Sequence, residues 1–590
     1  MNSSGLYIEI AVIAVYMLYL LGIGAAFKNF NHDISDFFRG GGRGTWWLVG
    51  ASVFMANISA YTFTGASGVA FEAGWSVATI YIANSVGLFL AFLFFAAWFR
   101  QLRAITGPEV IEMRFGRTTQ QLYAFLMVIL GVVGSGLVLW AMAIFTAAVF
   151  GFPIWVIILV LGAVVMAYST SGGSWAVMAT DFVQSLIMVP TTIIVGVLAL
   201  LAMGGFTGMG ELVRNAGLES DFNLINGTGE FSGGQFTLTW ALGIFMTQSI
   251  LSNSMVSGPR FFSVKDGWEA RKAAFLAFVL MAMGCVFWFL PPMAARLLFE
   301  SDVLSAGASL NKPAEAAYAV ASIKLLPLGM TGVIMVAMFS ATMSSLDSGI
   351  NRNAAIVIRD ILPMLRKSMG LEPMEAEREL VWSRWVSLAL GLVVMGIALY
   401  YSLMGKAGMF EFMLALASML GAPMSVPMLL GMFVKRVPAW SAVFAVFCGL
   451  MPSLLAFAFG LEWSFQQKVF INVGCGTAGF LSSMLFWKSA SQAYRTKVEE
   501  FFTKMHLPVD FEKEVGKAND LSQLKILGNF VLGISSFFFL LLLVPNPLGG
   551  RVVILCLASS VALTGVLMRW VGARQARLSA AKEAAVSTIS

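Results

Sequence analysis

Charged side chains are scarce in this chain. Asp, Glu, Lys and Arg make up 12% of its 590 residues, against roughly 25% in a soluble domain. Histidines number two and cysteines four; no CxxC or Cys/His spacing occurs, so neither a zinc site nor a disulfide framework is indicated. His32 and His506 lie in polar segments, which excludes a histidine-ligated haem or proton relay within a membrane. A phosphate-binding GxxxxGK(S/T) motif is also missing, and no nucleophile–base pair points to an enzyme.

Long apolar runs are abundant instead. Hydrophobic residues make up 58% of the chain and the mean hydropathy is +0.83, the composition of an all-α polytopic membrane protein. With about 20 residues per crossing, the runs predict about 15 transmembrane helices, over residues 6–26, 46–70, 76–99, 119–148, 153–170, 174–204, 238–257, 271–299, 327–360, 381–404, 408–432, 438–460, 466–487, 525–545 and 551–570.

The basic residues predict how these spans are oriented. With the N-terminus outside and the spans alternating, all but seven of the 37 Lys and Arg residues fall on the cytoplasmic side, as the positive-inside rule requires. The seven are Arg214, Arg296, Lys312, Lys324, Lys406, Lys468 and Arg551. The C-terminus is then cytoplasmic, and the net charge of +6 indicates topology and no nucleic-acid partner. We expect a multi-pass protein of the plasma or inner membrane, with the lipid bilayer as its partner.

Polar residues and glycines interrupt two of the predicted spans. The second span holds Asn57, Ser59, Thr62 and Thr64 at its centre, and the seventh holds Gln248, Ser249, Ser252, Asn253 and Ser254. The breaks lie five spans apart, so each begins a block of five helices. Broken helices at matching positions of two halves indicate an inverted-repeat transporter with its site near the midplane. Unwound backbone is tolerated in a membrane only where protein or a wet cavity surrounds it.

A third polar cluster lies in the ninth span. Ala341, Ser344, Ser345 and Ser348 follow one another at i, i+3, i+4 and i+7, a spacing that places three hydroxyls on one stripe of a helix. These hydroxyls and the nearby carboxylate of Asp347 are costly at this depth unless they have a function. Oxygen atoms are the ligands that hard cations prefer, so the cluster predicts a Na⁺ site.

Further motifs accompany these clusters. They are Ala56-Asn57-Ile58-Ser59-Ala60, Gly65-Ala66-Ser67-Gly68, Thr106-Gly107-Pro108-Glu109, Arg114-Phe115-Gly116, Gly172-Gly173-Ser174-Trp175-Ala176-Val177, Thr180-Asp181-Phe182-Val183-Gln184 and Ser344-Ser345-Leu346-Asp347-Ser348. Together the motifs resemble the sodium/solute symporter family, which contains the sodium/glucose cotransporters and has the LeuT-type fold. The resemblance covers roughly residues 5–460.

The resemblance implies a LeuT-type 5+5 inverted repeat with extra helices at both termini. Residues 1–30 are then an extra N-terminal helix, 44–204 the first repeat with core helices 1–5, and 238–435 the second repeat with core helices 6–10. Residues 436–590 hold accessory helices and a charged cytoplasmic segment, 488–523.

The resemblance also implies where Na⁺ binds. The family's main sodium site lies between the first and eighth core helices. The matching positions are the backbone carbonyls of Met55, Ile58 and Ala341 and the hydroxyls of Ser344 and Ser345. Carbonyls freed by a helix break suit a hard cation, so the side chains of Met55 and Ile58 should matter little.

Acidic and neighbouring polar residues complete the ion-related predictions. The family places an acidic residue of the fifth core helix near the sodium pathway, and here that residue is Asp181. We expect Asp181 and Ser348 to form a second ion site; the alternatives for Asp181 are a structural hydrogen bond or a place in a cytoplasmic vestibule. Asp347, Asn351 and Arg352 are expected to support the inner gate, with Asp347 facing the cavity or pairing with Arg352.

Substrate contacts follow from the sugar-carrying branch of the family, which holds its sugar with polar side chains of core helices 1, 2, 6, 7 and 10. The matching residues here are Asn57, Thr62, Tyr81, Asn84, Thr247 and Met281. A sugar needs many oriented hydrogen bonds and methionine offers none, so a carboxylate or an amino acid fits as well. No Arg or Lys is expected at the midplane, which weighs against a dicarboxylate.

The sequence therefore predicts a Na⁺-coupled secondary active symporter that imports a small polar organic solute by alternating access. Sugar, carboxylate and amino acid remain open as the solute. One alternative is H⁺ coupling through Asp181 or Asp347. Another is a transporter-like membrane sensor that detects a solute and signals through residues 488–523.

Overall fold

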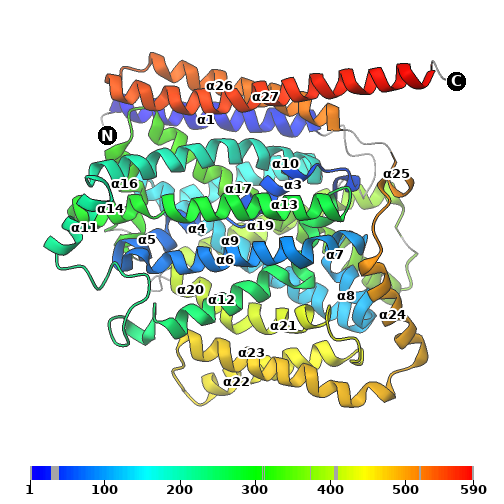
Figure 1. Ribbon diagram of the computed structural model, residues 1–590. Helices are drawn as coiled ribbons and strands as arrows, with labels where there is room; N and C mark the ends of the chain where they lie inside the picture. Colours follow the sequence, from blue (N-terminus) through cyan, green and yellow to red (C-terminus); the bar gives the residue numbers. More distant parts are fainter. Residues whose placement is uncertain are drawn as a thin grey trace.

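The structure is a computed structural model that describes residues 3–27, 39–308, 310, 312–372, 374–403, 409–516 and 520–587. Lys406 and the end of the predicted N-terminal segment, 28–30, lie outside the described residues. Within the described ranges every regular element is a helix (Figure 1), which confirms the all-α prediction.

The first half of the chain opens with a long helix, α1 (Ser3–Phe27), and a short turn, η2 (Gly40–Gly42). The helices up to the second break then follow in this order: α3 (Trp46–Ala56), α4 (Ala60–Phe63), α5 (Gly65–Ala73), η3 (Gly74–Val77), α6 (Ala78–Leu90), η4 (Ala91–Phe95), α7 (Ala96–Gln101), α8 (Gly107–Phe115), α9 (Arg117–Phe150), α10 (Ile154–Ala202), α11 (Gly205–Asn215) and η5 (Ser232–Gly234).

The second half has a similar succession. Its helices are α12 (Leu238–Asn253), η6 (Met255–Ser257), η7 (Pro259–Ser263), α13 (Gly267–Phe287), α14 (Leu290–Leu298), α15 (Glu300–Ala306), η8 (Pro313–Ala316), α16 (Ala317–Leu325), α17 (Met330–Ile356), η9 (Val357–Ile361), α18 (Leu362–Ser368), α19 (Ala376–Leu403), α20 (Met409–Leu416), η10 (Ala417–Gly421) and α21 (Ala422–Leu430).

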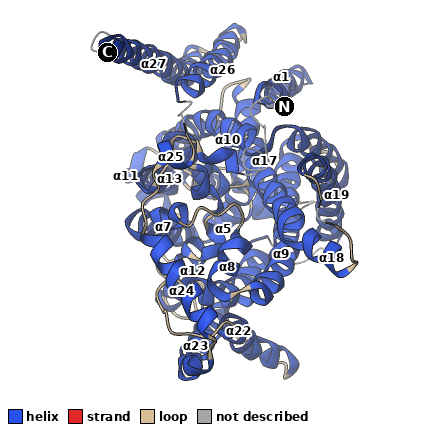
Figure 2. Ribbon diagram, turned by 90° about the vertical axis from the view of Figure 1, so that its right-hand side faces the viewer, coloured by secondary structure: helices blue, strands red, loops and turns tan. Residues whose placement is uncertain are grey.

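The C-terminal helices flank this core. They are α22 (Ser441–Ala458), α23 (Phe465–Ser482), η11 (Ser483–Ser489), α24 (Gln492–His506), α25 (Phe511–Glu514), α26 (Asp520–Leu540), η12 (Leu541–Leu543) and α27 (Leu548–Ser587). The hairpin of α26 and α27 lies beside α1 along one edge of the molecule, and α22 and α23 lie along the opposite edge (Figures 1 and 2).

The long helices run side by side between two ends of the molecule. One end carries α7, α8 and α24, at the right of Figure 1, and is called the α8 end below. The opposite end carries α11 and is called the α11 end. Among the described residues 11 helices are long and apolar enough to cross a membrane, and three shorter apolar helices cover Tyr7–Tyr19, Trp46–Ala56 and Ile154–Met166.

The count of about 15 helices differs from these 11 mainly where helices are short or interrupted. In the predicted spans 46–70 and 238–257, α3 has only 11 residues and α12 only 16, because each helix ends at its polar break. The described side chains of α10 fall in two arms that match the predicted crossings 153–170 and 174–204. In the first arm Gly162 lies against Met395 of α19, and in the second Asp181 accepts a hydrogen bond from Ser52 of α3.

The first break separates α3 from α4. Helix α3 ends at Ala56. The chain then passes through Asn57 and Ile58 to Ser59, whose φ of −151° and ψ of 179° are fully extended. The Ser59 hydroxyl accepts a hydrogen bond from the Tyr61 backbone N–H, a typical helix N-cap. The predicted interruption at Asn57 is thereby confirmed.

The second break lies at the end of α12. The helix stops at Asn253, and Ser254 takes an extended conformation with φ −76° and ψ 158°. The Asn253 amide nitrogen donates to the Gly87 carbonyl of α6 at 3.1 Å. A side chain at Gly87 would meet the Ser252 hydroxyl at 3.0 Å, so glycine permits the close approach of α6 that holds this break.

Candidate ion and solute site

A cavity of about 440 Å³ extends from the first break toward the α8 end, a size typical of small-molecule sites. Helices from both halves of the chain supply its walls. Its polar and charged lining residues are Asn57, Tyr123, Gln248, Ser252, Ser257, Arg260, Arg352 and Ser425. A smaller cavity of about 100 Å³ shares Ala56, Ser257, Arg260 and Arg352 with it, and reaches Thr106 and Gly107 of α8.

The unwound backbone of the first break is bonded directly to α17. The Ser345 hydroxyl donates to the Ile58 carbonyl at 2.7 Å, and the Ala60 backbone N–H donates to the Thr342 hydroxyl at 3.0 Å. The structure therefore brings together the two segments that the sequence predicts to share a Na⁺ ion. Met55 and Ala341 are fully buried beside them, although the Met55 carbonyl accepts a hydrogen bond from the Ile58 N–H at 3.2 Å.

Two oxygen atoms near this junction are buried without a hydrogen-bond partner. They are the hydroxyl of Ser344 and Oδ1 of Asp181, neither of which makes a hydrogen bond of ordinary length and angle, although the Ser344 side chain lies close enough to the Asp181 carboxylate to interact with it as a hydrogen-bonding neighbour. An unpaired buried oxygen costs about 1–3 kcal/mol, which a bound cation would offset. With the Ile58 carbonyl and the Ser345 hydroxyl next to them, these oxygens form a donor set that fits Na⁺.

Arg260 lies between the two residues predicted for a second ion site. Its Nη2 is 3.6 Å from Oδ2 of Asp181 and donates to the Ser348 hydroxyl. Asp181 is fully buried and also accepts a hydrogen bond from Ser52. In this conformation the guanidinium group of Arg260 therefore bridges Asp181 and Ser348.

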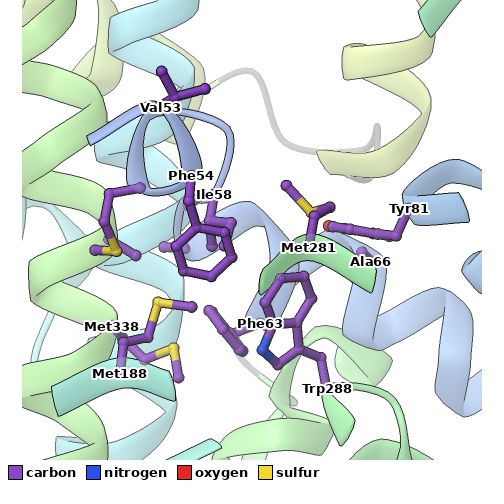
Figure 3. Close-up of a cluster of buried hydrophobic side chains, with 14 of the residues drawn as sticks. Val53, Phe54, Ile58, Phe63, Ala66, Tyr81, Met188, Met281, Trp288 and Met338 are labelled. Carbon is purple, nitrogen blue, oxygen red and sulfur yellow. The ribbon is translucent and has the colours of Figure 1, made fainter. Parts of the chain in front are cut away.

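The α11 side of the first break is closed by packed side chains (Figure 3). The Tyr81 hydroxyl donates to the Thr62 hydroxyl at 2.9 Å, and Trp288 stands edge-on to the rings of Tyr81 and Phe63, at centroid distances of 5.6 and 6.2 Å. Met281 lies in the same cluster and has no exposed surface. Three of the six predicted substrate residues thus form part of a barrier rather than the wall of the cavity.

The other three predicted substrate residues have different surroundings. Asn57 lines the large cavity, with its amide nitrogen bonded to the Val53 carbonyl at 2.8 Å. Asn84 of α6 and Thr247 of α12 are buried. The side-chain carbonyl oxygen of Asn84 and the hydroxyl of Thr247 have no hydrogen-bond partner. These two oxygens remain available to a polar ligand in another conformation.

The predicted gate residues lie around the smaller cavity. Asn351 and Arg352 line it together with Ser348, whereas Asp347 is fully buried. The Arg352 side chain is exposed and faces both cavities.

A charged cluster lies beyond the barrier, toward the α11 end. Lys312 pairs with Glu411, and the Glu315 carboxylate accepts a hydrogen bond from the Met409 backbone N–H at 2.9 Å. Burial raises the pKa of Glu315 to about 7, and the nearby carboxylates of Glu411 and Glu72 add to the rise. Glu315 also lies against Gly68 of α5, where a Cβ would meet its backbone nitrogen at 3.3 Å.

Two basic side chains, Arg260 and Arg352, line the cavity. The sequence places Arg352 at the inner gate and gives neither residue a contact with the solute. Arg260 follows the second break in Gly258-Pro259-Arg260, a segment that reads as a loop but folds as η7 beside the first break. Gln248, Ser252 and Ser425 also line the cavity; the polar break in the seventh span was the signal for the first two.

Comparison with solved structures identifies the architecture. A Na⁺-coupled sialic acid symporter, solved in a substrate-bound outward-open state, superposes with a TM-score of 0.70 at 21% identity over 82% of this chain and 98% of that chain. Two inverted repeats with broken helices and a central site characterise this LeuT-type fold. The fold and the site together define a multi-pass membrane transporter.

The chain belongs to the sodium:solute symporter family, whose pattern it matches over residues 37–449. The pig sodium/myo-inositol cotransporter 2 is 29% identical over 484 residues, covering 76% of this chain and 69% of that protein. The sodium/sialic acid symporter SiaT of Proteus mirabilis is 24% identical over 492 residues, covering 81% and 95%. The protein is therefore a Na⁺-coupled symporter, not an enzyme, and Na⁺ is its coupling ion.

Proposed function

We propose that this symporter imports a small polar organic solute, with Na⁺ held between the first break and α17. The observation that carries the proposal is the junction itself: the Ser345 hydroxyl touches the freed Ile58 carbonyl at 2.7 Å, while the Ser344 hydroxyl and Oδ1 of Asp181 are buried without partners. The proposed Na⁺ ligands are the carbonyls of Met55, Ile58 and Ala341 and the hydroxyls of Ser344 and Ser345.

The proposed orientation places the α8 end in the cytoplasm and the α11 end outside. The positive-inside rule supports it, because the basic residues of α8, α18 and α24 all belong to loops on one side. The large cavity then opens inward, and the cluster of Tyr81, Trp288 and Met281 closes the outer side. On this assignment the structure is an inward-facing state of a protein of the plasma or inner membrane.

Transport in this scheme depends on the fit of Na⁺ to one state. Na⁺ binding from outside replaces the direct Ser345–Ile58 hydrogen bond by shared coordination, and so favours the outward-open arrangement of α3 and α17. Closure of the aromatic cluster over the solute then gives access to the inner cavity. Each inward Na⁺ contributes about 2.3 kcal/mol per 100 mV of membrane potential and about 1.4 kcal/mol per tenfold gradient.

The solute is proposed to be small and polar because the inner cavity is lined by amides and hydroxyls. Asn57, Gln248, Ser252 and Ser425 offer both donors and acceptors, and binding sites use a few such groups to orient a ligand. Relatives named for myo-inositol and sialic acid support a polyhydroxylated or carboxylated solute of similar size.

A Na⁺ titration of protein stability tests the ion site without knowledge of the solute. We expect Na⁺, but not K⁺, to raise the melting temperature of the purified protein. Ser344→Ala and Ser345→Ala should each raise the Na⁺ concentration for half-maximal stabilisation roughly tenfold, since one oxygen ligand contributes about 1.4 kcal/mol.

The matched control is Ser85→Ala. This serine is also buried, but its hydroxyl bonds the Tyr81 carbonyl within its own helix, α6, so its loss should leave the Na⁺ response unchanged. Wild-type Na⁺ dependence in both Ser344→Ala and Ser345→Ala would place the ion elsewhere. Uptake of labelled inositol, sialic acid, amino acids and carboxylates into Na⁺-driven proteoliposomes then identifies the solute class.

A further inference from the structure

Two guanidinium groups face the cavity of about 440 Å³, called the inner cavity below, and no acidic side chain is found among its described lining residues. Arg260 and Arg352 line both the large and the small cavity. Among the described residues that line either cavity, none is Asp or Glu. The walls of this space therefore carry positive charge only.

The two arginines differ in their partners. Arg260 is neutralised from behind by the fully buried Asp181, 3.6 Å away, and donates to Ser348. Arg352 has no ion pair within the described ranges, and its side chain is exposed to the cavity. Among the described residues that line the two cavities, no acidic side chain compensates the charge of Arg352.

An arginine without an ion-pair partner on the wall of a transport cavity can bind an anion that enters the cavity. Ionisable residues that line the path of a substrate or an ion commonly have this role in membrane transporters. A guanidinium group needs oxygen acceptors in a planar arrangement, and a carboxylate supplies two at once. The neutral groups nearby, Asn57, Gln248 and Ser425, can bond the uncharged part of such a ligand but cannot balance the charge.

We propose that Arg352, with Arg260 beside it, is the counterion of a carboxylate on the transported solute, so that the inner cavity selects an anionic polar solute over a neutral one. The inference rests on the proposed function of the same cavity, and it narrows the solute class that the neutral lining leaves open. Arg352 receives the carboxylate, and the amides and hydroxyls around Asn57 receive the polar remainder.

Cysteine labelling tests the charge of the cavity without a known solute. In a background that lacks the four native cysteines, Ser425→Cys places a thiol in the cavity wall. Anionic sulfonatoethyl and cationic trimethylammonioethyl methanethiosulfonates are compared, and the ratio of their rates is normalised to Ser489→Cys, an exposed control. We expect the cavity to favour the anionic reagent about fivefold, as one charge at roughly 8 Å produces between two reagents of opposite charge at the dielectric constant of water.

Variants of Arg352 decide whether this residue is the source. Arg352→Gln should abolish the preference for the anionic reagent, and Arg352→Lys should keep most of it. Equal normalised rates in the parent protein, or a preference that persists in Arg352→Gln, would overturn the proposal.

Matched solutes then test recognition of the carboxylate. Glucuronate is compared with glucose, and N-acetylneuraminate with its methyl ester, as stabilisers of the purified protein in Na⁺. The proposal is supported if the carboxylate solute of a pair stabilises the protein and the neutral solute does not. This stabilisation should be lost in Arg352→Gln and partly kept in Arg352→Lys. Equal or stronger stabilisation by the neutral solute refutes the proposal. Na⁺ titration of the parent protein without solute reports on the ion site separately, so a failure there bears on the proposed function alone.

Discussion

At the scale of single residues, Asp181 is the point where the ion and the charge of the cavity meet. It has no exposed surface, faces Arg260 at 3.6 Å and keeps one oxygen without a partner. Its negative charge restrains Arg260 and, at the proposed ion site, would attract a cation bound beside Ser344.

Asp181→Asn separates these effects from shape, because the amide is nearly isosteric with the carboxylate. We expect it to raise the half-saturating Na⁺ concentration by at least about tenfold, since a negative charge beside the proposed ion site is lost. It should also lower stability, because removing one member of a buried pair typically costs about 3–5 kcal/mol. Na⁺-dependent melting measures both, with Asp302→Asn, which breaks the exposed Lys324 pair, as the control. An unaltered Na⁺ response would reject the ion-related role of Asp181.

Glu315 is the second residue whose charge should matter, through pH. Burial raises its pKa to about 7 in this conformation, against about 4.3 for an exposed glutamate, so this folded form binds a proton more tightly than the unfolded chain. The stabilisation is complete below about pH 4.3, and it is lost as pH rises to about 7. By linkage the closed state should lose roughly 3 kcal/mol across that window.

Melting curves between pH 5.5 and 8 measure this dependence. The wild type should lose stability as pH rises to about 7, and Glu315→Gln, which mimics the protonated form, should flatten that part of the profile. Glu462→Gln changes an exposed acid and serves as the control. Identical profiles for wild type and Glu315→Gln would show that this carboxyl group is already ionised in the closed state.

Some site residues could be predicted from the sequence because their arrangement is local. The stripe of Ser344 and Ser345 follows from helical spacing, and the freed carbonyl of Ile58 follows from a polar break. The contribution of Arg260 and Arg352 could not be predicted in this way. It depends on how η7 folds back beside α3 and on which way the last turns of α17 face, and both are set by packing between distant segments.

At the scale of elements, the added helix α1 is fixed to α17, the helix of the proposed ion site, by a carboxylate. Glu9 is fully buried and accepts hydrogen bonds from the backbone N–H groups of Gly329, at 2.8 Å, and of Gly332. These N–H groups belong to the first turn of α17, where they have no carbonyl partner within the helix. The positive end of the helix dipole also favours a carboxylate at this position. Gly332 is required, since a Cβ would lie 2.7 Å from the Glu9 carboxylate.

Glu9→Ala should therefore lower the stability of the protein by about 2–4 kcal/mol, since two buried N–H groups lose their acceptor. Glu9→Gln keeps an acceptor oxygen and should cost clearly less. Thermal unfolding in detergent measures the difference. If alanine proves no more damaging than glutamine, then α1 is held by its apolar contacts and not by this cap.

Element boundaries were predicted well for long uninterrupted helices and poorly near functional breaks. Residues 381–404 became α19 (Ala376–Leu403), and 525–545 became α26 with η12, because an apolar run of bilayer length has one stable conformation. Runs 46–70 and 238–257 are equally apolar overall, yet each contains a break. Mean hydropathy is averaged over a window of many residues, so it does not detect a break of about three residues whose backbone leaves the helix and bonds to a neighbouring helix.

At the scale of the whole molecule, the structure is closed on one side and open on the other. The hydrogen bond between Tyr81 and Thr62, the rings around Trp288 and the Lys312–Glu411 pair close the α11 side, while the cavity of about 440 Å³ extends toward the α8 end. The solved sialic acid symporter was captured in an outward-open state. Alternating access requires this chain to reach a comparable state, and Na⁺ binding is the step proposed to favour it.

Na⁺ should therefore protect the inner cavity from reagents. In the background without native cysteines, a thiol at Ser425→Cys should react several-fold more slowly in Na⁺ than in K⁺. A tenfold shift in population from the state described here to the outward-open state needs a difference in Na⁺ binding free energy between the two states of only about 1.4 kcal/mol. Ser489→Cys, exposed in this structure, should react equally in both salts. Ser344→Ala should remove the protection at moderate Na⁺, which ties the global change to the ion site. Labelling that is equally fast or faster in Na⁺ would contradict the proposed scheme, because Na⁺ would then not favour the outward-open state. In that case binding of the solute, and not of Na⁺, would have to drive the change between the two states.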